Sequence, residues 1–440
     1  MSQLVYRITT LLGQILKPVP LGTNLGLFQL LFALVSGRFL PSRGAVFPAL
    51  ADLGLSGPEV RRAEAALATG RWQIADLVTA WRAAIRQEGH TQPRSYGGYR
   101  PVPCDLVGFF RPRLVGHSGK HYTSHAAKAL PAVVVGLSVS VVRLGKTRLA
   151  VPRQILRQEA KDGGEAGLQK RLVEQTVQDL AADEVIVVDA GFALAHLLEQ
   201  KQARFVVRGR QNLTARRNTL PPYQGKGAPP KRGDLVRPLA RTYKGKTRAA
   251  TPADRCVSWC HEGRRIEAAV YENLVLSDAL PGSACFTCVV IRDPRYKEPL
   301  VLVSNLSASA HVLWQLYRDR WPIEQMPLAA KQMLGAERSF VSGSESRFRL
   351  PELALLAGNV LSYVAATSQP VATGFWDRCA RPTCGRLRRA LSRVTFSDLP
   401  VPSGQFRKKA SITAHLLTGV KGHRRQKADQ PPLEVQQKAA

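Results

Sequence analysis

The chain has 440 residues, with 63 Lys and Arg against 32 Asp and Glu, which gives a formal net charge of +31. This balance excludes an ordinary acidic cytosolic enzyme and favours a polyanionic partner, nucleic acid before an anionic membrane. With 45% hydrophobic and 22% charged residues, the composition is that of a folded chain long enough for two or three domains, and not that of a disordered basic tail.

No segment of the sequence predicts a membrane span or an export signal. The most apolar stretch, Leu25–Val35, contains Gln29 and is much shorter than the roughly 20 residues that a bilayer span needs, so we expect a buried helix there. The first ten residues lack a charged region followed by an apolar run, which predicts a cytoplasmic location. The odd number of cysteines, 7, favours reduced thiols over a disulfide framework.

Residues 1–98 are predicted to be helical. Ser56 with Glu59 three residues later forms a capping-box pattern, and Gly70 predicts the end of that helix. In the following helix the apolar residues form one stripe at helical spacing: Ile74, Leu77, Val78, Trp81 and Ile85. Two short helices joined at a glycine are compatible with a helix-turn-helix that reads DNA, or with a pair that only packs together.

Strands and helices alternate over residues 99–207. A hairpin is predicted over Pro131–Pro152 with its turn near Gly145, and a helix over 167–184. The apolar run 185–188 predicts a buried strand that ends at Asp189, followed by a helix over 192–202 and a strand over 204–210. This alternation predicts an α/β core with a sheet covered by helices.

A basic, β-rich insertion is predicted over residues 208–298. Residues 208–248 are rich in Arg, Lys, Pro and Gly and contain a single acid, Asp234, and strand-like stretches follow at 265–276 and 284–293. Arginines of the basic segment are expected to track phosphates, which gives affinity without sequence information; they are Arg208, Arg210, Arg216 and Arg217. Residues 299–366 are predicted as the second part of the α/β core, in which a last strand at 299–306 leads back to a long helix. Residues 367–440 are predicted as a basic helical region with a flexible tail.

The segment YRDRWPIEQMPLAAK, residues 317–331, holds four polar residues with regular spacing. On a single helix Tyr317, Arg320, Glu324 and Lys331 would share a stripe about 60° wide. A phenol, a guanidinium and an ammonium beside one carboxylate can hold a phosphate backbone against a carboxylate-bound metal. The same spacing also suits a solvated helix face with ion pairs four residues apart.

The order Y-x2-R-x3-E-x6-K, together with the strand-terminal Asp189, resembles the YREK motif of bacterial insertion-sequence DDE transposases. The four residues from Asp189 to Phe192 look like the D-x-G-[FY] pattern of that family at its second acid. The resemblance covers about residues 105–331. It implies an α/β RNase H-like catalytic core with a β-rich basic insertion, between an N-terminal all-α region and a helical C-terminal region. In such a core three acids converge from two strands and a helix.

The matching positions imply Asp189 as the second acid and Glu324 as the third, with Tyr317, Arg320 and Lys331 on the DNA backbone. The first acid is predicted to be Asp105, which precedes the hairpin, although the next residue is a leucine where the family often has a small polar one. Other upstream acids fall in predicted helices or loops and fit less well: Asp52, Asp76, Asp162, Asp179 and Asp183.

Three carboxylates from separate elements can hold two Mg²⁺ ions, with Mn²⁺ able to substitute, and such a pair activates a water or a 3′-hydroxyl and stabilises the leaving oxygen. The resemblance implies an enzyme that cleaves transposon ends and joins the freed 3′-hydroxyl to target DNA. Its partners would be the terminal repeats, the target duplex and a second copy of the chain, at the bacterial nucleoid and away from membranes. Two alternatives are a nuclease of the same fold that cleaves without joining, and an inactive DNA-binding descendant.

Two prolines, Pro322 and Pro327, depart from the motif, because proline in a helix interior costs about 3 kcal/mol. If a helix begins at Pro322, the stripe holds only for Glu324 and Lys331, and a kink at Pro327 would move these two apart. An inactivated copy is therefore an alternative.

Cysteines and aromatic residues give two further hypotheses. Cys256-x3-Cys260 with His261 and Cys285-x2-Cys288 have zinc-like spacing, although an offset of three in a strand directs the second pair to opposite faces. Tyr296, in the loop before the last strand, is better placed than Trp314 or Trp321 to stack on a distorted DNA end.

Overall fold

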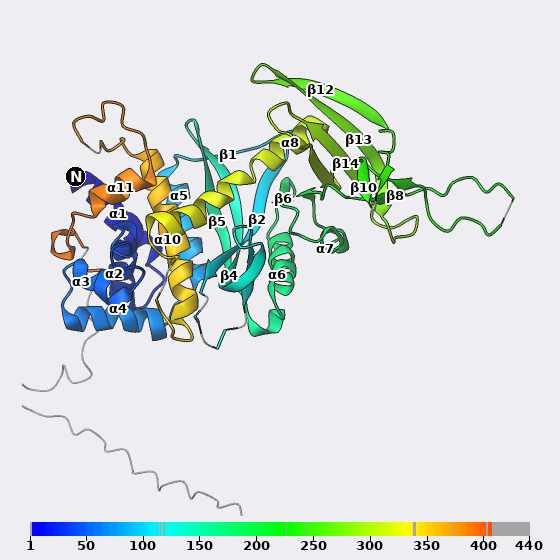
Figure 1. The fold of residues 1–440 in the computed structure, drawn as a ribbon. Helices are drawn as coiled ribbons and strands as arrows, with labels where there is room; N and C mark the ends of the chain where they lie inside the picture. The colour runs from blue at the N-terminus through cyan, green and yellow to red at the C-terminus, as the bar shows by residue number, and fades with distance from the viewer. Residues whose placement is uncertain are drawn as a thin grey trace, which may run out of the picture.

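The computed structural model describes residues 2–406 except 112, 115, 118, 226, 244, 338, 339, 373, 402 and 403. One large sheet crosses the molecule, with a helical layer at one end and a β-rich lobe at the other (Figure 1). This is a mixed α/β architecture, as predicted. The predicted C-terminal tail from residue 407 onward lies outside the described part of the chain.

Five helices form the described part of the N-terminal region. Their bounds are α1 Ser2–Ile15, α2 Thr23–Val35, α3 Val46–Asp52, α4 Gly57–Thr69 and α5 Ile74–Glu88. The predicted capping box is present at α4, where the Ser56 backbone N–H donates to Glu59 Oε2 at 2.9 Å. Helix α2 is the predicted buried helix, with twelve of its residues in the core.

The apolar stripe of α5 packs against a helix from the C-terminal part of the chain. Trp81 is fully buried, and its Nε1 donates to Asn359 Oδ1 at 2.8 Å in helix α10 (Ser346–Thr367). Asn359 Nδ2 in turn donates to the Ala150 carbonyl oxygen at 2.5 Å. The N-terminal helices therefore share one hydrophobic core with α10 and the edge of the sheet. Helix α10 is long and apolar enough to cross a membrane, but 83% of its most apolar window is buried inside the fold.

The centre of the sheet has the strand order β5-β4-β2-β6-β7, in which β2, β6 and β7 are parallel and β4 is antiparallel to both of its neighbours. The bounds are β2 Arg100–Phe110, β4 Lys128–Leu144, β5 Thr147–Arg157, β6 Glu184–Val188 and β7 Phe205–Arg208. Two short strands, β1 Gln92–Pro93 and β3 Lys120–Thr123, also pair with β4. The predicted hairpin is confirmed as β4 and β5, with Gly145 in the turn at a φ of 54°.

Both faces of β6 are buried, which explains its uninterrupted apolar sequence. Ile186 and Val188 pack in one cluster with helices α6 (Glu165–Gln178) and α7 (Leu194–Glu199). A short turn, η1 (Ala160–Asp162), precedes α6 in the chain. Val185 packs on the opposite face, in the cluster that contains helix α8 (Ala310–Arg318). Successive residues of a strand point to opposite faces, so four apolar residues in a row suit a strand between two helical layers.

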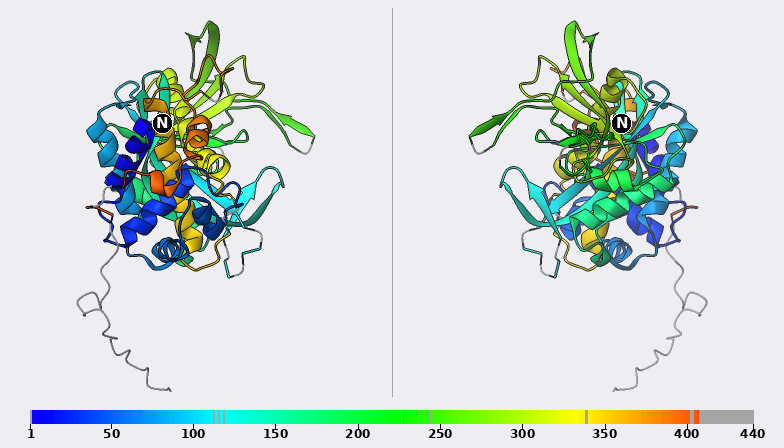
Figure 2. Two further views of the ribbon diagram at one scale, coloured as in Figure 1. Left: turned by 90° about the vertical axis from the view of Figure 1, so that its left-hand side faces the viewer. Right: turned by 90° about the vertical axis from the view of Figure 1, so that its right-hand side faces the viewer.

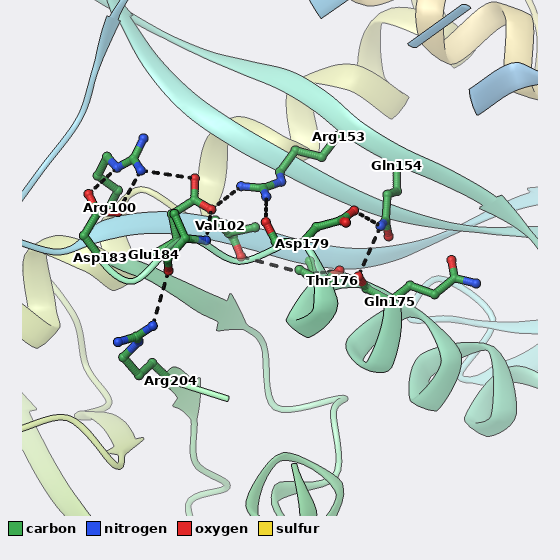
Figure 3. Close-up of polar contacts among 12 residues, drawn as sticks. Arg100, Val102, Arg153, Gln154, Gln175, Thr176, Asp179, Asp183, Glu184 and Arg204 are labelled. Atoms are coloured by element: carbon green, nitrogen blue, oxygen red, sulfur yellow. Dashed lines mark hydrogen bonds and ion pairs between the residues drawn. The ribbon is translucent and has the colours of Figure 1, made fainter. Parts of the chain in front are cut away.

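The N-terminal end of β6 is fixed by a polar network (Figure 3). Glu184 is 7% exposed, and Arg153 Nη1 lies 2.7 Å from its Oε2. Arg153 also donates to the Asp179 carbonyl oxygen at 2.7 Å, while Arg100 pairs with Asp183 at 2.6 Å. These contacts join β5, β2 and the segment after α6 to the start of β6. Because β6 is held at this end, the position of Asp189 at its other end is fixed as well.

The part of the chain between β7 and α8 is rich in strands, and most of these strands extend the central sheet. Strand β15 pairs antiparallel with β7, and the sheet continues through β14, β13, β8 and β9, with β12 beside β13. The bounds are β8 Ala215–Arg217, β9 Leu235–Val236, β12 Arg255–His261, β13 Arg264–Leu276, β14 Phe286–Arg292 and β15 Leu300–Ser304. A separate hairpin comprises β10 Arg241–Tyr243 and β11 Lys246–Arg248. Figure 2 shows this lobe projecting away from the helical layer.

After α8 the chain passes through three short helical turns before α10. They are η2 Trp321–Glu324, α9 Gln325–Leu328 and the π-helical η3 Ala329–Met333. Helix α11 (Cys384–Leu391) and the turn η4 (Phe396–Asp398) then pack against the N-terminal helices and α10.

Candidate active site

Two of the predicted acids lie on neighbouring parallel strands. The pairing of β2 with β6 sets Pro101 opposite Val185 and Pro103 opposite Val187. Continued two residues further, this register sets Asp105 opposite Asp189, which directly follows β6. Residues opposite each other in adjacent strands point to the same face of a sheet. The two carboxylates therefore leave the sheet side by side.

Asp105 is half-buried, and its environment disfavours the charged form. Burial raises its pKa to about 6, and the negative charges of Glu324 and Asp189 act in the same direction. The Arg320 guanidinium and the Leu106 backbone N–H, which donates to Asp105 Oδ1 at 2.8 Å, oppose this shift only in part. A further positive charge close to Asp105 would therefore stabilise its ionised form.

The segment with the other motif residues is not one helix, so the predicted continuous stripe over 317–331 is wrong. Helix α8 ends at Arg318, and Pro322 is the second residue of the 3₁₀ turn η2 that follows. Proline lacks the N–H that would continue the α-helical ladder but suits the start of a new helical segment. Pro327 lies in the single turn α9, after which the backbone forms a π-helical turn.

Two motif side chains, those of Tyr317 and Arg320, nevertheless contact the acids. Tyr317 Oη donates to Asp189 Oδ1 at 3.1 Å. Arg320 lies between the other two carboxylates, with Nη1 3.3 Å from Asp105 Oδ2 and Nη2 2.5 Å from Glu324 Oε1. Burial and the charge of Asp189 raise the pKa of Tyr317 to about 12. Burial disfavours the charge of Arg320, but its anionic neighbours outweigh this effect and raise its pKa.

Lys331 contacts strand β2 three residues beyond Asp105. Its Nζ donates to the Gly108 carbonyl oxygen at 2.6 Å and lies over the rings of Phe109 and Phe110, 5.3 and 5.5 Å from their centroids. Burial lowers the pKa of the ammonium. The predicted neighbour of Lys331, Glu324, pairs with Arg320 instead. The turn of chain around Pro327 thus directs Lys331 to the strand that carries the first predicted acid.

The predicted basic segment contributes exposed arginines beside Asp189. Arg208 Nη1 lies 3.7 Å from Asp189 Oδ1, with 43% of its side chain exposed, and Arg210 is exposed two residues further on. Arg217, in contrast, pairs with both carboxylate oxygens of Asp254 at 2.7 and 2.6 Å, and Arg216 donates to main-chain carbonyl oxygens. Arg208 is therefore better placed than Arg216 and Arg217 for a ligand at the acids.

A cavity of about 580 Å³ opens beside Tyr317 and Arg320. Its walls carry two exposed aromatic side chains, Tyr296 at 65% and Trp321 at 51%, while Trp314 is buried at 4%. The basic residues of the lining are Arg148, Arg208, Arg295, Lys297, Arg318 and Arg320. Sequence reasoning predicted Arg208 and Arg320 and missed the other four. Arg318 lies inside the motif itself, and Arg148 is at the turn of the β4–β5 hairpin, where no local pattern marks it.

The donor chemistry of the three acids suits a hard divalent cation, because Mg²⁺ and Mn²⁺ prefer carboxylate oxygens. As arranged here, no three His, Cys, Asp or Glu side chains of the described residues are close enough together to hold a metal ion. The Arg320 guanidinium contacts both Asp105 and Glu324. The cysteines of the insertion are likewise not grouped closely enough, among the described residues, to hold a zinc ion. Cys288 is buried, and the other three are exposed.

Residues 153–357, slightly less than half of the chain, match the family described as Transposase DDE domain. The match begins in β5 and ends in α10, and it includes Asp189 and all four residues of the YREK pattern but not Asp105. No curated protein matches the chain. The family match supports a role as a DDE transposase, and with it DNA as the partner and a divalent metal as the cofactor.

Proposed function

We propose that this chain is a DNA transposase of the YREK-type DDE class with an RNase H-like core. It cleaves the ends of its element and joins the freed 3′-hydroxyl to target DNA. The observation that carries the proposal is the convergence of side chains far apart in sequence: Tyr317 bonds to Asp189, and Arg320 contacts Asp105 and Glu324. A solvated helix face would not bring a strand residue and a post-strand residue into contact with the same short segment.

The topology supports the RNase H-like assignment. The first two acids come from β2 and β6, which are adjacent and parallel, and the third follows α8, which covers one face of this sheet. Between the second and third acids the chain forms the β-rich lobe. Both features agree with what the family resemblance implies.

We assign Asp105, Asp189 and Glu324 as the residues that would hold two Mg²⁺ ions, with Mn²⁺ able to substitute. Bound there, the ions would activate a water or 3′-hydroxyl and stabilise the leaving oxygen of a phosphodiester. In the metal-free protein Arg320 lies between two of the carboxylates, and its positive charge reduces the repulsion between them. Metal binding at these acids therefore competes with Arg320, which would then be available for a phosphate oxygen.

The surroundings of the acids suit a DNA end. Tyr317, Arg320, Lys331, Arg208 and Arg210 supply donors and positive charge for the backbone, in a chain of net charge +31. The two exposed aromatic side chains of the adjacent cavity are positioned to stack on a base. We further propose that residues 1–98 bind DNA outside this site, and that the enzyme acts on the bacterial nucleoid as a homodimer, because two element ends must be held together.

A nicking assay tests the proposal. The purified protein and its Glu324→Gln variant are incubated with Mg²⁺ and a plasmid carrying the DNA that flanks the gene. End-specific nicks by the wild type alone are expected. Cleavage without joining would instead favour a nuclease of the same fold, and tight DNA binding that persists in EDTA without nicks would favour an inactive DNA-binding descendant.

A further inference from the structure

A second carboxylate of the motif segment, Asp319, is fully buried and bound to three donors. It accepts hydrogen bonds from Arg94 Nε at 2.5 Å, Tyr96 Oη at 2.8 Å and Arg148 Nη1 at 2.9 Å. Its side chain is 0% exposed. None of these donors belongs to the acid cluster described above.

Asp319 occupies the point where the segment changes direction. It caps the C-terminus of α8, one residue before Arg320 and two after Tyr317. Arg148 holds the main chain at the same point, because its Nη1 also donates to the Arg318 carbonyl oxygen at 3.1 Å. The break between α8 and the following turn is thus clamped through both a side chain and the backbone.

The clamp comes from two separate parts of the fold. Arg94 and Tyr96 lie in the connection between the N-terminal helices and β2, where the Arg94 backbone N–H donates to the Val141 carbonyl oxygen at 3.3 Å. Arg148 lies at the start of β5, in the hairpin with β4. Both parts are hydrogen-bonded to β4, which pairs with β2, so they fix the break relative to β2 and therefore relative to Asp105.

Stability alone does not explain such a group. A buried ion pair contributes little net stability compared with a well-packed apolar replacement, and it is better suited to fixing one geometry. Here the geometry decides where the side chains on either side of Asp319 point: Tyr317 toward Asp189, and Arg320 toward Asp105 and Glu324.

We propose that Asp319 is a positioning residue of the catalytic segment, which acts through Tyr317 and Arg320 and is itself held by Arg94, Tyr96 and Arg148. The expected effect of Asp319 on catalysis rests on the proposed function. Its effect on the positions of Tyr317 and Arg320 is a property of the folded protein without DNA. Asp319 contacts none of the predicted metal ligands, and of its three donors Arg148 also lines the cavity beside Tyr317 and Arg320.

The test compares Asp319→Asn with a matched control, Glu352→Gln. Glu352 is also 0% exposed and bound by an arginine, with Arg157 Nε and Nη2 both 2.8 Å from its carboxylate, but it lies in α10. 3-Fluorotyrosine at position 317 gives a fluorine NMR signal that reports the surroundings of this phenol without any reaction. We expect its chemical shift to move toward that of the free amino acid in Asp319→Asn and to stay unchanged in Glu352→Gln.

A second readout is single-turnover cleavage at saturating DNA. Asp319→Asn should lower this rate at least about tenfold, which corresponds to about 1.4 kcal/mol, and leave DNA affinity unchanged, whereas Glu352→Gln should leave both unchanged once the folded fraction is equal. Equal behaviour of the two variants in both readouts would overturn the proposal. If Asp319→Asn does not fold, Tyr96→Phe removes one of the three hydrogen bonds, and an unmoved fluorine signal in that variant would also overturn it. A wild type that nicks no DNA contradicts the proposed function, and the fluorine signal then decides the role of Asp319 by itself.

Discussion

Replacing Asp105 with asparagine should stabilise the metal-free protein at neutral pH, and the gain should depend on pH. Burial, reinforced by the charges of Glu324 and Asp189, raises the pKa of Asp105 from 3.8 to about 6. An asparagine at this position can still accept the hydrogen bond from the Leu106 backbone N–H. It carries no charge that burial could disfavour.

The sign follows from proton linkage. Because the pKa of Asp105 is higher in the folded than in the unfolded chain, the folded state binds this proton more tightly, and stability falls as pH rises from about 4 to about 6. A pKa change from 3.8 to about 6 corresponds to about 3 kcal/mol at neutral pH. The side chain is 28% exposed, so water screens part of this cost. We expect Asp105→Asn to gain about 1 to 2 kcal/mol at neutral pH and almost nothing near pH 4.

The assay is urea unfolding of both proteins in EDTA at pH values from about 4 to about 8. A control with the opposite sign is Asp162→Asn. Asp162 is buried, but Arg171 and the Glu159 backbone N–H outweigh burial and lower its pKa. That variant should lose stability at neutral pH, and the loss should shrink as pH falls through the folded-state pKa. A stability difference between wild type and Asp105→Asn that does not change with pH would refute the reasoning.

Three further predictions concern metal, packing and DNA. Mg²⁺ should raise the unfolding temperature of the wild type but not of Glu324→Gln, because ligand binding to the folded state alone stabilises it, and EDTA should reverse the effect; thermal unfolding checks this. Arg157→Ala should cost about 3 kcal/mol in urea unfolding, because it leaves the carboxylate of Glu352 buried without its partner. Arg208→Gln should weaken binding to all DNA sequences and reduce the salt dependence of affinity by about one counterion, which binding measured at several salt concentrations checks. Arg217→Gln should instead lower the free energy of unfolding, which urea unfolding checks.

The sequence predicted those parts of the site that local patterns mark. A run of four apolar residues before Asp189 indicates a strand buried on both faces, and the spacing of Tyr317, Arg320 and Glu324 indicates residues that act together. The β4–β5 hairpin and the capping box at Ser56 follow from equally local rules. Each of these depends on residues within a few positions of one another.

The parts that could not be predicted depend on contacts between distant residues. Asp319 is 225, 223 and 171 residues from Arg94, Tyr96 and Arg148, and no periodicity links such positions. The shared core of the N-terminal helices and α10 is likewise a property of packing. The conformational restriction of proline predicted a helix break near Pro322. It did not predict the contact of Lys331 with β2, because that contact depends on the path of the chain after the break.

The most direct test of the central claim is a strand-joining assay. A duplex that ends in the element's terminal sequence with a free 3′-hydroxyl is incubated with the protein, target plasmid and Mg²⁺ or Mn²⁺. Wild-type protein should join the 3′-end to the target, while Asp105→Asn, Asp189→Asn and Glu324→Gln should yield no joined product although they bind the duplex. Undiminished joining by any of these variants, or joining in EDTA, would contradict the assignment of the three carboxylates to a metal-dependent transposase site.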